Sequence, residues 1–193
     1  MRPSPLKAEL VILENIVELR LESAAAAMKH FGVALRKRRI EAIAGVIEKE
    51  ATSSRSIGDI RIAERLERRA RAIRIFYDHG LDTVRLVPPV DLQEGYRGKI
   101  LLVSVSGGAA GGITCLRSGD LWHEEILMSA AEEIRDLGFE HAAVDSAGGA
   151  SVRFDADGTI RIYGTSDSFG ECDKTIASDL IGRSFPERRI VVE

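Results

Sequence analysis

The chain has 193 residues, of which 45% are apolar and 30% are charged, and its formal net charge at neutral pH is -3. This length and apolar content suit one ordinary globular domain or two small ones. The composition excludes a uniformly basic nucleic-acid coat and an acidic disordered tail, because neither class of protein contains so many apolar residues.

Cysteine content and charge distribution indicate the compartment. Two cysteines, Cys115 and Cys172, are too few to cross-link a small secreted scaffold, so we expect reduced thiols. The sequence contains no Cys-x-x-Cys pair that would predict a metal site. The segment from Met1 to Glu18 carries several charges and does not resemble a signal peptide. The longest uncharged run, Ile100 to Leu116, is shorter than the roughly 20 residues that span a bilayer. We therefore expect a cytoplasmic protein without a membrane partner.

Charge also divides the chain into two unlike parts. Up to residue 90 there are 17 Lys and Arg against 12 Asp and Glu, a charge of +5, and from residue 91 there are 10 against 18, a charge of -8. The hydrophobic pattern changes at the same place, from a helical period to short β-branched runs between glycine-rich turns. We place the boundary near Pro88-Pro89 and expect a helical region over residues 1–88 and a second domain over residues 89–193.

Three helices are predicted in the first part. Ser4 and Pro5 are typical of a helix start, and one long helix is expected to run to Met28, with a second from Val33 to about Glu50 and a third from Asp59 to His79, ending at Gly80. The first helix has an apolar stripe formed by Leu10, Leu13, Val17, Leu21, Ala24 and Met28. The third has a stripe formed by Ala63, Leu66, Ala70, Ile73 and Tyr77.

These helices need partners for their apolar stripes, so we expect a homo-oligomer held together by the N-terminal helices. Their arginine-rich faces are interpreted as solvated surface, because +5 over 90 residues is modest for a nucleic-acid-binding module. Nucleic-acid binding by these arginines is kept as a lesser alternative, which predicts a steep loss of affinity with salt.

The second part has the pattern of an α/β (α+β) domain, in which a mixed sheet is flanked by two helices. Lys99 to Val105 is predicted as a buried strand, and helices are predicted from Leu121 to Leu137 and from Glu171 to Ile181. Further strands are expected over Phe139 to Asp145, Ala150 to Phe154, Thr159 to Tyr163 and Arg189 to Val192.

A glycine-rich segment, Gly107 to Gly112, follows the first of these strands. No Lys-Ser/Thr pair follows its glycines, and Ile113 to Leu116 has the pattern of a strand. The segment is therefore interpreted as a loop between strands and not as a nucleotide site.

His123 is the first candidate for chemistry. With Asp120 as N-cap it would be the third residue of a helix, on the inward face that also carries Leu127, Ala130 and Ile134. The positive end of a helix disfavours imidazolium and attracts phosphate, so a neutral ring could act there as nucleophile or base. A core histidine bound to a backbone carbonyl is an equally good interpretation of this position.

The second candidate is the loop from Tyr163 to Gly170, which is rich in hydroxyl groups and bracketed by glycines. Such a loop can direct backbone N–H groups at one anion, and Lys174 could add a cation from the following helix. The alternative is a strand-to-helix turn in which Ser168 caps the helix.

Together these elements resemble the janus/ocnus family, whose best-known activity is that of a protein phosphohistidine phosphatase. Three motifs carry the resemblance: Lys99 at a strand start, Trp122-His123 opening a helix, and the Tyr-Gly-x-Ser-x-x-aromatic-Gly loop from Tyr163 to Gly170. The family implies that His123 is catalytic and that no metal or other cofactor is required. It also implies that the phosphoryl group is held by Lys99, Ser166, Asp167, Ser168, Phe169 and Gly170. Lys174, which stands at the position of a family histidine, and Arg117, which lies near that of a family arginine, are further candidates for phosphate binding.

The resemblance thus implies a metal-independent phosphatase acting on a phosphorylated protein or a small phosphoamidate. Lys99 and loop amides can stabilise transferred phosphoryl charge, although Asp167 would repel phosphate unless its side chain turns outward. The alternative is a non-catalytic module that binds a phosphorylated or acidic ligand. Ser106, Asp145 and His123 could form a hydrolase triad, but the chain lacks a Gly-x-Ser-x-Gly elbow.

Overall fold

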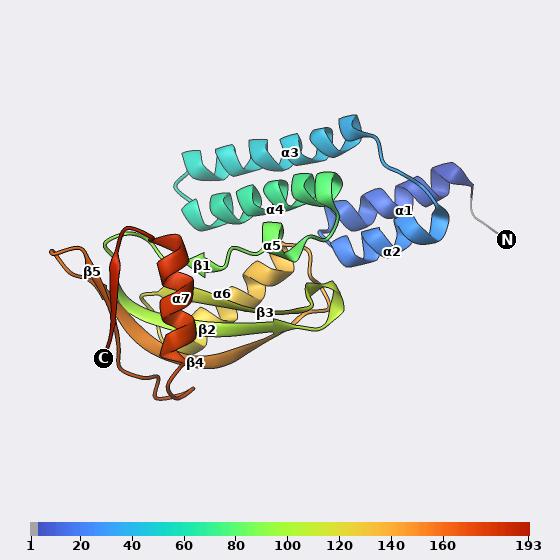
Figure 1. Cartoon of the computed structure of the whole chain (residues 1–193). Helices are drawn as coiled ribbons and strands as arrows, with labels where there is room; N and C mark the ends of the chain where they lie inside the picture. Colours follow the sequence, from blue (N-terminus) through green and yellow to red (C-terminus); the bar gives the residue numbers. More distant parts are fainter. Residues whose placement is uncertain (1–3) are drawn as a thin grey trace. The chain divides into compact units, whose positions relative to one another are not determined.

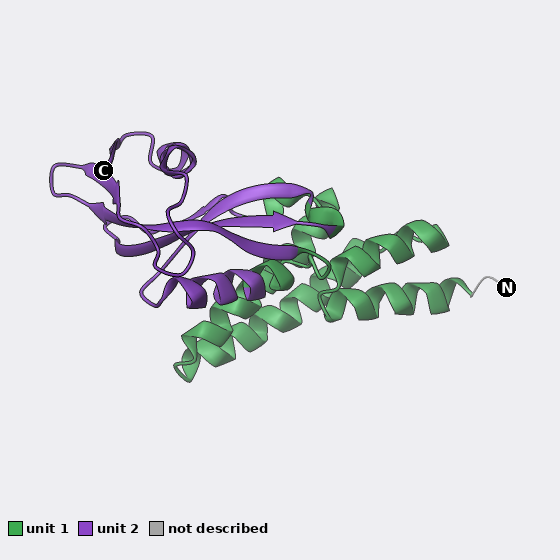
Figure 2. Ribbon diagram, turned by 90° about the horizontal axis from the view of Figure 1, so that it is seen from below, with its two compact units in different colours: residues 1–87, 108–110, 133–142 green, residues 88–107, 111–132, 143–193 purple. Residues whose placement is uncertain are grey.

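A computed structural model describes residues 4–193 and divides the chain into two compact units (Figure 2). Unit 1 comprises Met1–Val87, Gly108–Ala110 and Glu133–Ala142, and unit 2 comprises the rest. Residues 1–3, which begin the segment without signal-peptide character, lie outside the described residues. Within residues 4–193, no helix has both the length and the apolar composition needed to cross a bilayer.

Unit 1 is built mainly of helices (Figure 1). The prediction of one long first helix is wrong, because the chain turns at Leu19, which has a left-handed φ of 57°. Ser4 does cap the first helix, since its Oγ accepts the amide N–H of Lys7 at 3.4 Å. The helices are α1 (Pro5–Val17), α2 (Leu21–Phe31), α3 (Lys37–Ser56), α4 (Ile60–His79) and the single turn α5 (Thr83–Leu86).

The helix faces that are buried differ in part from those predicted. In α1 the buried residues are Ala8, Ile12 and Ile16, whereas Leu10 and Val17 of the predicted stripe are about half exposed. In α4 the predicted stripe is buried from Ala63 to Ile73, but Phe76 takes the place expected for Tyr77. The start of α4 is as predicted, because Asp59 accepts the amide N–H of Ile62 at 3.2 Å.

The arginine-rich face of α4 is only partly solvated, in contrast to the prediction. Arg65 donates from Nε to Asp136 at 2.6 Å, and Asp136 is only 3% exposed. Arg69 lies 3.6 Å from the same carboxylate. These arginines therefore pair with a buried acid inside unit 1.

Unit 2 contains a six-stranded mixed sheet with the order β1-β3-β2-β4-β5-β6. Its two edge strands run parallel to their neighbours, and the central pairs are antiparallel. The glycine-rich segment from Gly107 joins two antiparallel neighbours through a single turn, η1 (Gly108–Ala110), as the loop interpretation expected. The strands are β1 (Val90–Asp91), β2 (Arg97–Ser106), β3 (Gly112–Gly119), β4 (Ala143–Phe154), β5 (Thr159–Tyr163) and β6 (Arg189–Val192).

Strand β4 differs most from expectation, because it begins only at Ala143 and then runs without a break through both predicted strands to Phe154. Its pairing with β2 shifts register between Leu101 and Val103, which accommodates an extra residue near Gly148. Gly148 has φ 93°, and a Cβ there would lie 2.5 Å from the carbonyl oxygen of Glu171. The bulge thus lets the loop before the last helix approach the sheet closely.

The two helices of the second part lie on opposite faces of this sheet, as predicted (Figure 1). On one face, α7 (Lys174–Ser184) buries Ala177 and Ile181 against a core that includes Ile100, Val152 and Ile162. On the other face, α6 (His123–Asp136) packs Ile126 on Gly119, where a Cβ would lie 3.0 Å from Ile126 Cγ1. The observed architecture confirms an α+β fold.

Candidate functional site

His123 is the first residue of α6 and is only 6% exposed. The helix begins two residues later than predicted, and Asp120 is not its cap. Instead the carboxylate of Glu125 accepts the amide N–H of Trp122 at 2.9 Å, in the manner of a capping box. The inward face predicted for His123 is confirmed, since it shares that face with the buried residues Ile126, Ala130 and Ile134.

The imidazole of His123 contacts β4 through its Nε2 and Cδ2 atoms. Its Nε2 is 3.2 Å from the carbonyl oxygen of Ala150, and a Cβ on Gly149 would be 2.7 Å from the ring. Because a carbonyl oxygen only accepts, Nε2 carries the proton and Nδ1 of the neutral ring keeps its lone pair. The hydrogen bond to a backbone carbonyl, which was expected of a structural histidine, therefore also leaves Nδ1 able to act as nucleophile or base.

The loop from Ser166 to Gly170 lies beside this ring, since the same Cβ on Gly149 would be 2.8 Å from Ser166 Cβ. Ser166 and Gly170 exchange backbone hydrogen bonds of 3.2 and 2.9 Å, and Ser166 Oγ accepts the amide N–H of Phe169 at 3.2 Å. Within residues 4–193, the amides of Asp167 and Ser168 have no hydrogen-bond acceptor. These two N–H groups at the tip of the loop can therefore bind an anion.

Lys99 and Glu124 complete the surroundings of the histidine. The Lys99 ammonium lies 4.7 Å from the centroid of the Trp122 ring, so it stacks beside the start of α6. The hydroxyl of Ser168 donates a hydrogen bond to the carboxylate of Glu124. This hydrogen bond, the Glu124 amide and the positive charge of Lys99 hold the pKa of the Glu124 carboxyl below its usual range. An ionised carboxylate therefore lies at the rim of the loop.

Lys174 and Arg117 are engaged in other contacts. Lys174 donates to the carbonyl oxygen of Glu193 at 2.8 Å and pairs with Glu171 at 2.5 Å, at the start of α7. The cap of that helix is Asp173 and not Ser168, because the Asp173 carboxylate accepts the amides of the second and third residues of the helix. Arg117 is 3% exposed and donates to the carbonyl oxygens of Pro88 and Leu116 at 3.0 and 2.9 Å. Its guanidinium thus helps to join β1 to β3.

The structure thus brings together His123, Lys99 and the Ser166 loop from three separate segments. Sequence reasoning missed Gly149 and Glu124 as members of the site. A Glu at the second position of a helix signals no site, whereas the Gly148-Gly149 pair inside a strand is a signal of close approach that could have been noticed.

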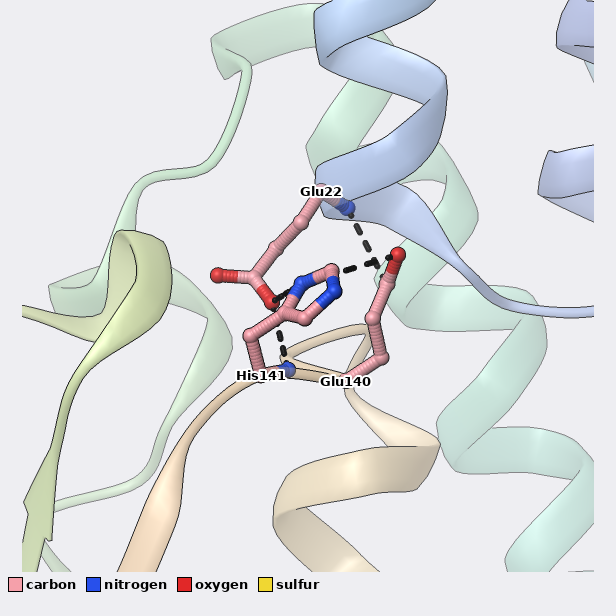
Figure 3. Close-up of side chains that lie close together, drawn as sticks. All are labelled: Glu22, Glu140 and His141. Atoms are coloured by element: carbon pink, nitrogen blue, oxygen red, sulfur yellow. Dashed lines mark hydrogen bonds and ion pairs between the residues drawn. The ribbon is translucent and has the colours of Figure 1, made fainter.

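In unit 1, Glu22, Glu140 and His141 form a cluster of potential metal ligands whose nearest polar atoms lie within 4.8 Å of one another (Figure 3). Hydrogen bonds account for their positions. Glu22 accepts from the amide of Ala109 and from His141 N and Nδ1 at 2.7 and 2.9 Å. Glu140 accepts from the amides of Glu22 and Ser23, the second and third residues of α2, and so caps that helix. We interpret this cluster as a structural junction of unit 1.

Comparison with known proteins assigns the second part of the chain to a protein family. A family model described as the Janus/Ocnus family matches residues 84–189, which is more than half of the chain. The matched range contains every residue of the site around His123. The chain has no match among the curated proteins.

Proposed function

The chain belongs to the Janus/Ocnus family, and from this premise we propose that it hydrolyses phosphohistidine or a related phosphoamidate, with His123 as the catalytic residue. The observation that carries the proposal is the contact of two groups across Gly149. The His123 ring, with its Nε2 proton held by Ala150, lies beside a loop with two amides available for an anion. A reactive nitrogen and phosphate-binding donors are the two components that phosphoryl transfer needs.

The reaction breaks the P–N bond of the substrate, and the departing nitrogen takes up a proton. His123 Nδ1 either attacks phosphorus, forming a phosphohistidine on the protein that water then hydrolyses, or removes a proton from a water that attacks directly. Both routes consume one water and release inorganic phosphate together with the free histidine side chain or, from another phosphoamidate, the free amine. The Ala150 carbonyl, by holding the proton on Nε2, keeps Nδ1 as the reacting atom in either route.

Positive charge for the transferred group comes from Lys99 and from the amides of Asp167 and Ser168. Such preorganised donors stabilise developing phosphoryl charge, so the proposal requires no metal ion. The Ser168 hydroxyl is bonded to Glu124 in this structure and would turn to the phosphoryl group when substrate binds. The Asp167 side chain is exposed and is free to extend into solvent.

The first test is phosphate release from phosphoramidate and from a phosphohistidine peptide, with and without EDTA. We expect turnover by the wild-type protein that survives EDTA and falls by about a hundredfold or more in His123→Ala, since general acid–base or nucleophilic groups contribute about that much. His79→Ala, at an exposed helix end, is the matched control and should retain full activity. Equal rates for wild-type protein and His123→Ala would refute the proposal.

The same protein samples separate catalysis from simple binding. Calorimetric titration with a non-hydrolysable phosphonate measures affinity without turnover. A wild-type protein that binds the phosphonate and releases no phosphate from any phosphoamidate would favour the alternative, a non-catalytic phosphate-binding module. Acid-labile phosphate trapped on His123 during turnover would identify it as nucleophile, and its absence during rapid turnover would identify it as base.

A further inference from the structure

Three arginines that are distant in the sequence lie side by side on the sheet of unit 2. Arg97 of β2 pairs with Arg153 of β4, and Arg153 pairs with Arg161 of β5. Directly paired residues on neighbouring strands share a face and lie about 5 Å apart. We call Arg97, Arg153 and Arg161 the arginine row.

The arginine row lies on the same face as the site around His123. Side chains alternate along a strand, so Arg97 shares its face with Lys99, and Arg153 shares its face with Ser151 and Gly149. The His123 ring packs against Gly149. Arg153 lies four positions after Gly149 along β4, which at about 3.3 Å per residue is roughly 13 Å. The row therefore extends the site in one direction along the strands.

Like charges directly opposite one another destabilise a sheet, so anionic groups that pair with the arginine row would stabilise it. Inside the chain they are carboxylates. Asp155 pairs with Arg153 at 3.1 Å and with Arg161 at 2.5 Å, and Glu193 pairs with Arg161 at 2.8 Å. Arg97 is exposed, and within residues 4–193 its guanidinium has no acidic partner. One carboxylate is thus shared by two arginines and a third arginine has none.

We propose that the arginine row binds acidic side chains of a protein substrate, two to four residues from its phosphorylated residue. This inference rests on the proposed function, which places the phosphoryl group at His123. An extended peptide covers about 7 to 13 Å in two to four residues, which matches the distance from the site to the row. Guanidinium groups bind carboxylates in a two-pronged geometry, and the row already binds carboxylates within the chain.

An acidic peptide fits this surface better than a nucleic acid does. A nucleic acid gains affinity from many phosphate contacts over a long surface, and the chain from residue 91 has a charge of -8. Glu124 and Asp167 lie next to the site and would repel such a polyanion. A short acidic segment can contact the row alone.

Binding is measured by fluorescence anisotropy at low ionic strength, with the full chain and a labelled peptide that carries glutamates on alternate residues but no phosphate. We expect Arg97→Glu to weaken binding about five- to tenfold, because it replaces one exposed attractive charge pair by a repulsive one. Arg183→Glu makes the same change of charge on α7, which covers the other face of the sheet, and should bind like wild type. Because the peptide carries no phosphate, this test does not depend on catalysis.

Three results would overturn the proposal. Wild-type protein could fail to bind the acidic peptide, or Arg97→Glu and Arg183→Glu could weaken binding equally, which would indicate net charge alone. A single-stranded oligonucleotide could bind more tightly than the peptide and lose affinity in Arg97→Glu, which would make the row a nucleic-acid site. With an active protein and an acidic phosphohistidine peptide, Arg97→Glu should raise KM and leave kcat unchanged.

Discussion

Gly149 determines how closely two side chains of the proposed site can approach β4. The His123 ring and Ser166 both occupy space that a Cβ on this residue would fill. His123, Lys99 and the Ser166 loop could be proposed from residue type and motif spacing alone. The Gly148-Gly149 pair could have indicated a close approach, but that His123 and Ser166 are the groups that approach Gly149 depends on the bulge in β4 and on contacts with segments that precede and follow it in the sequence.

We therefore expect Gly149→Ala to lower the free energy of unfolding by about 1–3 kcal/mol, the usual cost of overpacking. Urea unfolding monitored by circular dichroism measures this change. Gly112→Ala is the control, because a Cβ there meets nothing within 4 Å and the backbone needs no left-handed φ. Equal stabilities of Gly149→Ala and wild type would show that His123 and Ser166 move aside freely.

At the scale of the element, the caps of α1 and α4 were predictable, whereas those of α6 and α7 and the break between α1 and α2 were not. Ser4 and Asp59 cap helices where their side chains suggested it. Leu19 adopts a left-handed conformation that costs a residue with a side chain about 1–2 kcal/mol, and no residue type in the Glu18–Arg20 turn indicates it. Burial of Leu19, which is 3% exposed, offsets that cost.

The exposed stripe on α1 follows from this break. It adjoins an apolar groove of about 490 Å³ that is lined by Val17 of α1, by Leu66 and Arg69 of α4, and by several residues of α3. By helical geometry, the acidic residues Glu14 and Glu18 lie along the edge of the exposed α1 stripe that contains Leu10. The basic residues Arg38 and Lys49 lie along the edge of the α3 surface that contains Val46. The α3 residues in the groove are Ala42, Ile43, Val46, Ile47 and Glu50.

The homo-oligomer expected from the sequence stays a prediction, and this groove is where it can be tested. A two-fold dimer with α1 of one copy on α3 of the other would bring the acidic and basic flanks together. We expect Val46→Glu to reduce the mass measured by sedimentation to that of one chain, because a charge would enter the apolar contact. Val84→Glu, at a still more exposed position in α5, should leave the mass unchanged. A wild-type protein of single-chain mass at high concentration would contradict the prediction.

At the scale of the whole molecule, unit 1 is assembled from three separate stretches of chain. A change of pattern near Pro88 could be seen in the sequence. The addition of Gly108–Ala110 and Glu133–Ala142 to the helices could not, because it depends on hydrogen bonds between residues 87 to 119 positions apart. Local patterns carry no information about such pairs.

Glu22 is the centre of these long-range bonds, and its carboxylate is buried. Replacing it with Ala leaves the amides of Ala109 and His141 without their acceptor, so we expect Glu22→Ala to lower the free energy of unfolding by roughly 2–5 kcal/mol. Urea unfolding measures the change, and Glu14→Ala, on the exposed face of α1, should cost less than about 0.5 kcal/mol. Similar losses in both variants would show that this junction contributes little.

The discontinuity of unit 1 also affects the order of events during synthesis. When the first 87 residues leave the ribosome, Glu22 and the start of α2 still lack partners that arrive only with Glu140 and His141. The helices emerge first, yet their unit is completed only after β2, β3 and the part of α6 up to Glu132, which belong to the other unit, have been made. The nascent helices therefore lack these hydrogen bonds until most of the chain has been translated.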